Sequence, residues 1–85
     1  MSHPQYEHIG DPDTKVIEEC GELIQEICKA LRFGWFNFHP DDPMRVSNLE
    51  RVKREMDDVA KAMGKLDAHL TQMSHDYWKE RDASA

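Results

Sequence analysis

The sequence predicts an all-α protein made of two long helices that fold back on each other as a helical hairpin. Two separate stretches carry apolar residues at three- and four-residue steps, the pattern of an amphipathic helix. Between them lie Pro40 and Pro43, which block regular helix and indicate a loop. The 85 residues allow one small domain. We expect an N-terminal arm over 1–13, a single domain over 14–80 and a frayed tail over 81–85.

The composition excludes several classes of protein. The chain is 39% apolar and 33% charged, which is enough apolar content to fold, and it carries a net charge of −6, so nucleic-acid binding through a broad basic surface is not expected. It has neither a signal peptide nor a run of ~20 apolar residues, so we expect no membrane partner and a cytoplasmic location. Cys20 and Cys28 would lie ~12 Å apart on one helix, too far for a disulfide, and should stay reduced.

The first helix is predicted to begin near Asp11 and Pro12 and to run to about Phe33. An Asp can cap a helix and Pro is tolerated at its first position, and Gly34 is placed to end it. Its wide apolar stripe comprises Val16, Ile17, Cys20, Leu23, Ile24, Ile27, Cys28 and Leu31.

The second helix is predicted to open with a capping box at Ser47–Glu50 and to fray from Lys79 onward. Its seam spans four heptads and comprises Leu49, Val52, Met56, Val59, Met63, Leu66, Leu70, Met73 and Tyr77. A helix of ~30 residues is ~45 Å long, more than the first helix can cover. We therefore expect a homodimer that closes a four-helix bundle, or a dimer of dimers forming a homotetramer. A dimeric coiled-coil spacer is the alternative.

Acidic residues recur at helical spacing in both helices. Glu19, Glu22 and Glu26 share a stripe that borders the apolar arc of the first helix, where like charges should repel. Glu18 points toward solvent by the same geometry.

A second acidic pair lies on the second helix, where Glu55 and Asp58 flank the seam and Asp57 lies on the opposite, solvated flank. In an antiparallel hairpin Glu19, Glu22, Glu55 and Asp58 can converge. Clustered carboxylates near a bundle interior call for hard divalent cations such as Mg²⁺ or Mn²⁺. A merely solvated acidic face is the alternative.

The two acidic motifs resemble those of the MazG family. The residues that carry the resemblance are Glu18-Glu19-Cys20-Gly21-Glu22-Leu23 and Glu55-Met56-Asp57-Asp58-Val59, and the resemblance covers roughly residues 14–70. Members are all-α nucleoside triphosphate pyrophosphohydrolases, related to dimeric dUTPases and to phosphoribosyl-ATP pyrophosphohydrolase. Their signature is E-E-x-x-E followed by E-x-x-D on the next helix.

The resemblance implies metal ligands and catalytic residues at Glu19, Glu22, Glu55 and Asp58, with Glu18 as an accessory acid. It also implies attack of water on the α-phosphate of a nucleoside triphosphate, which releases the monophosphate and pyrophosphate. The chain departs from the family pattern in the 32 residues between Glu22 and Glu55, a longer span than is usual. The extra residues form the aromatic loop, the segment 34–46 that contains Trp35 and Phe38. The departure therefore bears on which substrate is bound more than on the hydrolysis itself.

Five further residues are candidates for substrate binding. In the loop, Trp35 and Phe38 can stack on a base, or can anchor the loop to the core or a subunit interface. On the second helix, Arg54, Lys61 and Lys65 can reach phosphate oxygens, or can pair with nearby surface acids. The sequence thus predicts a Mg²⁺-dependent nucleotide pyrophosphohydrolase. The alternatives are a non-catalytic helical interaction module and an inactive relative that still binds metal.

Overall fold

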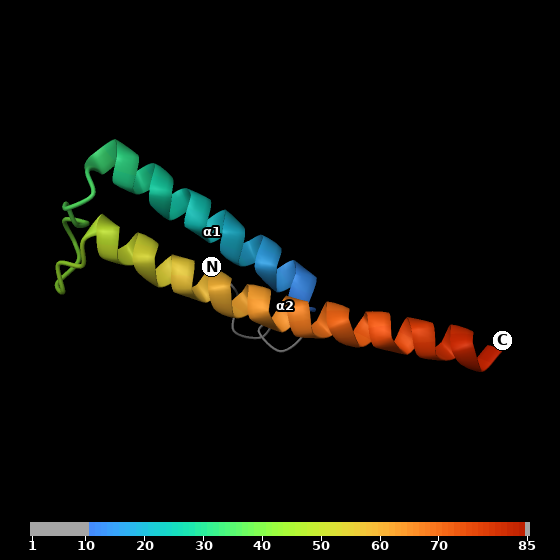
Figure 1. The fold of residues 1–85 in the computed structure, drawn as a ribbon. Helices are drawn as coiled ribbons and strands as arrows, with labels where there is room; N and C mark the ends of the chain where they lie inside the picture. Colours follow the sequence, from blue (N-terminus) through green and yellow to red (C-terminus); the bar gives the residue numbers. More distant parts are fainter. Residues whose placement is uncertain (1–10, 85) are drawn as a thin grey trace.

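The computed structural model describes residues 11–84 and confirms the all-α helical hairpin (Figure 1). Helix α1 spans Pro12–Phe33 and helix α2 spans Asn48–Ser84. The two run antiparallel, joined by a loop over 34–47. Within 11–84 no strand forms beyond an isolated bridge between Phe38 and Ser47. Residues 1–10 of the predicted arm lie outside the described residues.

The predicted start and end of α1 are confirmed. The Asp11 carboxylate accepts a hydrogen bond from the Thr14 backbone N–H at 3.2 Å, and Pro12 occupies the first helical position. At the other end the Gly34 N–H donates to the Ala30 carbonyl at 2.9 Å. Gly34 has a φ of 101°, a conformation that favours glycine. The chain therefore turns into the loop where the sequence predicts.

Helix α2 begins as predicted but extends further. The Ser47 hydroxyl accepts the Glu50 backbone N–H at 3.2 Å, one half of the capping box, while the Glu50 carboxylate lies 3.6 Å from the Arg54 guanidinium. The helix continues past Lys79, where fraying is predicted, as far as Ser84. That last segment contains neither Gly nor Pro, and Arg81 donates to the Tyr77 hydroxyl one turn earlier at 2.9 Å.

The hairpin is elongated. Its dimensions are 63 × 25 × 17 Å and its radius of gyration is 18.1 Å, whereas a compact chain of this length has about 12 Å. Helix α1 lies along the first part of α2, and the C-terminal part of α2 continues past the start of α1 (Figure 1). Neither described helix is both long and apolar enough to cross a membrane.

Little apolar surface is buried between the two helices. The buried apolar side chains of the described chain are Ala30, Val52, Val59 and Ala62. The predicted seam of α2 divides into two rows. In the first row Val52, Val59 and the half-buried Leu66 pack toward α1, whereas Met73, which continues this row, is 53% exposed. The second row is 37–56% exposed and comprises Leu49, Met56, Met63, Leu70 and Tyr77.

Helix α1 carries a matching exposed row, since Ile17, Ile24 and Leu31 recur every seventh residue and are 63–72% exposed. Successive residues turn by about 100°, so Ile24 lies roughly 140° around α1 from Glu19. Met63 likewise lies roughly 140° around α2 from Asp58. Because the two helices run antiparallel, both rotations lead to the same side of the hairpin. We call the side bearing the two exposed rows the apolar face, and the opposite side, which carries the clustered carboxylates, the acid face.

Candidate metal centre

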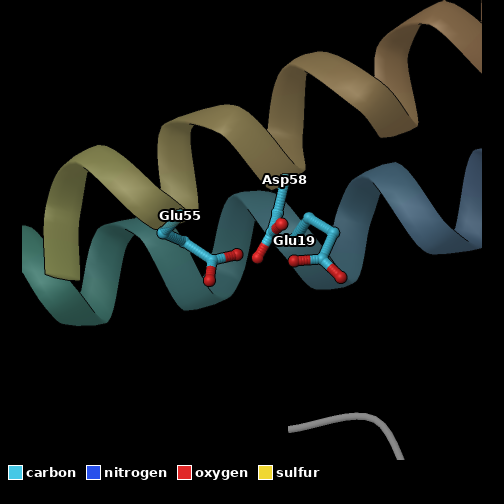
Figure 2. A group of neighbouring side chains, drawn as sticks. All are labelled: Glu19, Glu55 and Asp58. Carbon is cyan, nitrogen blue, oxygen red and sulfur yellow. The ribbon is translucent and has the colours of Figure 1, made fainter.

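Three of the predicted acids converge on the acid face. One carboxylate oxygen each from Glu19, Glu55 and Asp58 lies within 4.8 Å of the other two. Figure 2 shows the three side chains pointing toward one another, Glu19 from α1 and the other two from α2. The i, i+3 spacing of Glu55 and Asp58 places both on one side of α2. The antiparallel packing of α1 then brings Glu19 opposite them.

Glu19 is the most enclosed member of this group. Its side chain is only 9% exposed, although a carboxylate is costly to bury. One oxygen, Oε1, forms an ion pair with Lys15 at 3.0 Å. The other, Oε2, is buried and has no hydrogen-bond partner, and the same holds for Oε1 of Glu55. Buried polar atoms are nearly always satisfied in proteins, so both oxygens remain available to a hydrogen-bond donor or a cation.

The pKa values of the two glutamates in the cluster are shifted in opposite directions. Burial raises the pKa of Glu55 to about 8, with further contributions from a hydrogen bond to Glu19 and from the charges of Glu19, Glu22 and Asp58. The hydrogen bond from Glu55, together with Lys15, lowers the pKa of Glu19. Burial and the neighbouring negative charges therefore favour the protonated form of Glu55 beside an ionised Glu19. A cation can take the place of that proton.

Glu22 and Glu18 lie outside this three-oxygen group. Glu22 is half-buried and close enough to influence both glutamates, because it contributes to the lowered pKa of Glu19 and the raised pKa of Glu55. Glu18 is exposed on the outer side of α1, in agreement with its predicted direction. Three of the four predicted ligands are thus gathered together and the fourth lies beside them.

The donor set suits a hard divalent cation. Carboxylate oxygens are the ligands that Mg²⁺ and Mn²⁺ prefer. Oxygens bound to one Mg²⁺ at about 2.1 Å are at most ~4.2 Å apart. The three oxygens here lie within 4.8 Å of one another, so small side-chain movements bring them to that spacing. The two unpartnered buried oxygens, Glu19 Oε2 and Glu55 Oε1, show that the residues fit such an ion.

The three basic residues predicted to reach phosphate lie on exposed parts of α2. Arg54 is 3.6 Å from Glu50, and Lys61 is 2.9 Å from Asp57. The hydrogen bond and charge of Asp57 raise the pKa of Lys61. Lys65 is exposed as well. Arg54 and Lys61 thus make the surface ion pairs that were the alternative interpretation.

The aromatic loop is held to α2 by a network that the sequence analysis missed. The backbone N–H groups of Asn48 and Leu49 donate to the carbonyls of Asn37 and Trp35 at 2.8 and 2.7 Å. The buried Asn48 also donates its side-chain amide to the Gly34 carbonyl at 2.8 Å. Trp35 is half-buried beside these contacts.

A second anchor of the loop is Asp42, which accepts the N–H groups of Met44 and Val46 at 2.9 and 3.0 Å and pairs with Arg51 at 2.8 Å. These hydrogen bonds, the backbone ones first, lower the pKa of Asp42. An Asp two residues before a bonded N–H is a local turn signal, but the contact with Arg51 depends on the fold. The loop thus has a fixed shape.

A pocket of about 740 Å³ lies where this loop meets the two helices. It is lined by Glu26, Lys29, Phe33, Asn37, Phe38, His39, Pro40, Asn48 and Arg51. Of the two loop aromatics predicted to contact a base, Phe38 lines this pocket and Trp35 does not. The pocket joins residues up to 25 positions apart, so no local sequence pattern marks it.

Comparisons with protein-family models, curated proteins and solved structures give no match for this chain.

Proposed function

We propose that this protein is a nucleotide pyrophosphohydrolase that uses Mg²⁺ or Mn²⁺ to convert a nucleoside triphosphate to the monophosphate and pyrophosphate. The observation that carries the proposal is the convergence of Glu19, Glu55 and Asp58, together with the buried oxygen that lacks a hydrogen-bond partner on each of the two glutamates. The motifs that contain these residues, E-E-x-x-E and E-x-x-D, are those by which the sequence resembles the MazG family.

In this proposal Glu19, Glu55 and Asp58 would hold the cation, and Glu55 would release its proton to solvent in order to do so. A bound divalent ion supplies positive charge that polarises the α-phosphate and lowers the pKa of a bound water. Glu22, beside the cluster, accepts the proton of the attacking water. Water adds to the α-phosphorus, the bond to the bridging oxygen breaks, and pyrophosphate leaves. No covalent enzyme intermediate forms.

We further propose that a second copy of the chain covers the apolar face. The exposed rows on α1 and α2 both follow a seven-residue repeat, the spacing at which helices pack together in a bundle. Two hairpins joined through these rows form a four-helix bundle, and the acid face of each stays accessible to substrate. The same apolar face favours the rival function, a non-catalytic helical interaction module, which would need no cation.

A panel of nucleoside triphosphates with Mg²⁺ or Mn²⁺ and pyrophosphate detection tests the activity. Hydrolysis in ¹⁸O-water should place the label in the monophosphate. Asp58→Asn should abolish turnover, whereas the matched control Asp57→Asn changes a neighbouring exposed acid that pairs with Lys61 and should leave turnover intact.

Three outcomes would contradict the proposal in different ways. Diphosphate and orthophosphate as products would show that the scissile bond is wrong. Cation binding by calorimetry without hydrolysis of any nucleotide would identify an inactive metal-binding protein. No cation binding, with or without nucleotide, would leave the interaction module.

A further inference from the structure

The pocket at the loop end of the hairpin continues the acid face. Glu26, in its wall, follows Glu19 by seven residues, so it lies about 10.5 Å further along α1 on the same side. Arg51 precedes Glu55 by four residues on the matching side of α2. The pocket therefore begins about where a nucleoside would extend if its α-phosphate lay at the carboxylate cluster.

The walls of the pocket suit a flat, uncharged group better than a phosphate. Phe33 and Phe38 are 57% and 42% exposed. Each ring already has a guanidinium over one face, Arg32 at 5.3 Å from the Phe33 centroid and Arg45 at 5.8 Å from the Phe38 centroid, so a base would stack on the other face. The two cationic side chains in the wall already face carboxylates. Arg51 pairs with Asp42 at 2.8 Å, and Lys29 lies 3.5 Å from Glu26. Stacking on aromatic rings is a common way to hold a nucleobase.

Glu26 gives the pocket a chemical preference. Its Oε1 makes only the long contact with Lys29, and its Oε2 is buried without a hydrogen-bond partner. An ionised carboxylate only accepts hydrogen bonds, so it favours a ligand edge that donates. Cytosine, adenine and guanine carry an amino group, and a carboxylate accepting from the amino group of cytosine is an established pairing. At the position of the cytosine amino group uracil and thymine carry a carbonyl oxygen, which a carboxylate repels, so the ring N3–H is the donor that they offer instead.

We infer that this pocket holds the base of the substrate and that Glu26 selects an amino-bearing base over uracil or thymine. The inference rests on the proposed function and deepens it: the substrate is an amino-bearing nucleoside triphosphate, and Glu26 is a specificity-determining residue. Phe38 stacks on the base without distinguishing one base from another.

The test compares matched substrates that differ at the amino position, CTP with UTP and dCTP with dUTP. The intact protein should favour the cytosine member by about tenfold in kcat/KM, mainly through KM. Glu26→Gln should reduce that preference to within about threefold and leave Mn²⁺ affinity unchanged. Phe38→Leu should weaken both members of a pair equally, by about tenfold. Equal use of both bases, a uracil preference, or a cytosine preference that survives Glu26→Gln would overturn the inference while the hydrolase stands.

A binding measurement separates this inference from the proposed function. NMR titration of the metal-free protein with CMP or UMP requires no turnover. Shifts of the Phe33, Phe38 and Asn48 amides that are stronger with CMP would support the base pocket even if no triphosphate were hydrolysed. Equal shifts with the two nucleotides, or shifts confined to other residues, would overturn it.

Discussion

The acid face and the apolar face belong to the same two helices but differ in what each lacks. On the acid face Glu19 is buried, and three carboxylate oxygens, one each from Glu19, Glu26 and Glu55, have no hydrogen-bond partner, while Lys15 pairs with the other oxygen of Glu19. On the apolar face Ile24 and Met63 stand more than half exposed, each one member of a row that repeats every seven residues. In the proposed function the acid face takes a cation and the apolar face packs against a second copy of the chain.

This comparison implies that separate substitutions can disrupt the function of each face without affecting the other. A change on the apolar face should alter assembly and spare the cation site, apart from effects of unfolding. A change on the acid face should alter cation binding and catalysis and spare assembly.

The largest effect is expected from a charge on the apolar face. Met63→Glu would bury an unpaired carboxylate between subunits and should cost about 3–5 kcal/mol of assembly free energy. Light scattering at micromolar concentration should then show monomers or unfolded chain. Ala68→Glu places the same charge on the exposed outer side of α2 and is the matched control. If Met63→Glu behaves like this control, the apolar face is not an interface between copies.

The next effect concerns the cation. Glu19→Gln removes the charge of the most enclosed of the proposed ligands and should lower kcat/KM about 100-fold or more, since a bound cation contributes several kcal/mol of transition-state stabilisation. Calorimetry with Mn²⁺ should show the matching loss of binding. The control Glu50→Gln changes an exposed glutamate that pairs with Arg54. Unchanged Mn²⁺ affinity in Glu19→Gln would remove the cluster from the proposed site.

A smaller effect is expected from pH on the metal-free protein. Because the pKa of Glu55 is raised to about 8 in the fold, the folded state binds more protons than the unfolded chain between about pH 4.5 and pH 8. The contribution of Glu55 is thus fully present below about pH 4.5 and is lost as pH rises through 8.

Denaturant melts in EDTA at several pH values measure this contribution. Glu55→Gln keeps a hydrogen-bond donor toward Glu19 without the titration, so it should gain about 1–2 kcal/mol relative to the parent chain between pH 5 and pH 8. The figure is kept small because solvent partly screens the site. Identical pH slopes for the parent and the variant would show that Glu55 is already ionised in the fold.

The smallest effect is expected from the exposed basic residues of α2. Lys61→Ala and Arg54→Ala each remove one surface ion pair and should change stability by no more than about 0.5–1 kcal/mol. KM should stay within about threefold in both variants. A tenfold rise in KM for either one would instead show that its side chain leaves its acidic neighbour to bind phosphate, as the sequence also allowed.

Short-range sequence patterns predict the ends of the helices and the faces on which their acids lie. Asp11, Pro12 and Gly34 mark the two ends of α1, and Ser47 marks the start of α2, because caps depend on residues three or four positions apart. The same helical geometry places Glu55 and Asp58 on one side of α2 before any packing is known. The sequence alone therefore determined the two helices and the acids that each one presents.

Packing between the helices decided the rest. It selected Val52 and Val59 for the core and left Met63 uncovered, although all three fit one heptad seam. It brought Glu19 to Glu55 and Asp58 and left Glu22 beside the group, because the rotation of α1 against α2 fixes which carboxylates meet.

The tertiary structure also created the pocket, whose walls come from both helices and the loop. Glu26 and Arg51 lie 25 residues apart and meet only when the loop folds back. Asp42 and Asn48 hold that loop through hydrogen bonds to backbone and side-chain groups on both sides of the turn. A periodic pattern specifies the face of one helix, whereas the distance between two helices and the path of the loop depend on contacts that exist only in the folded chain.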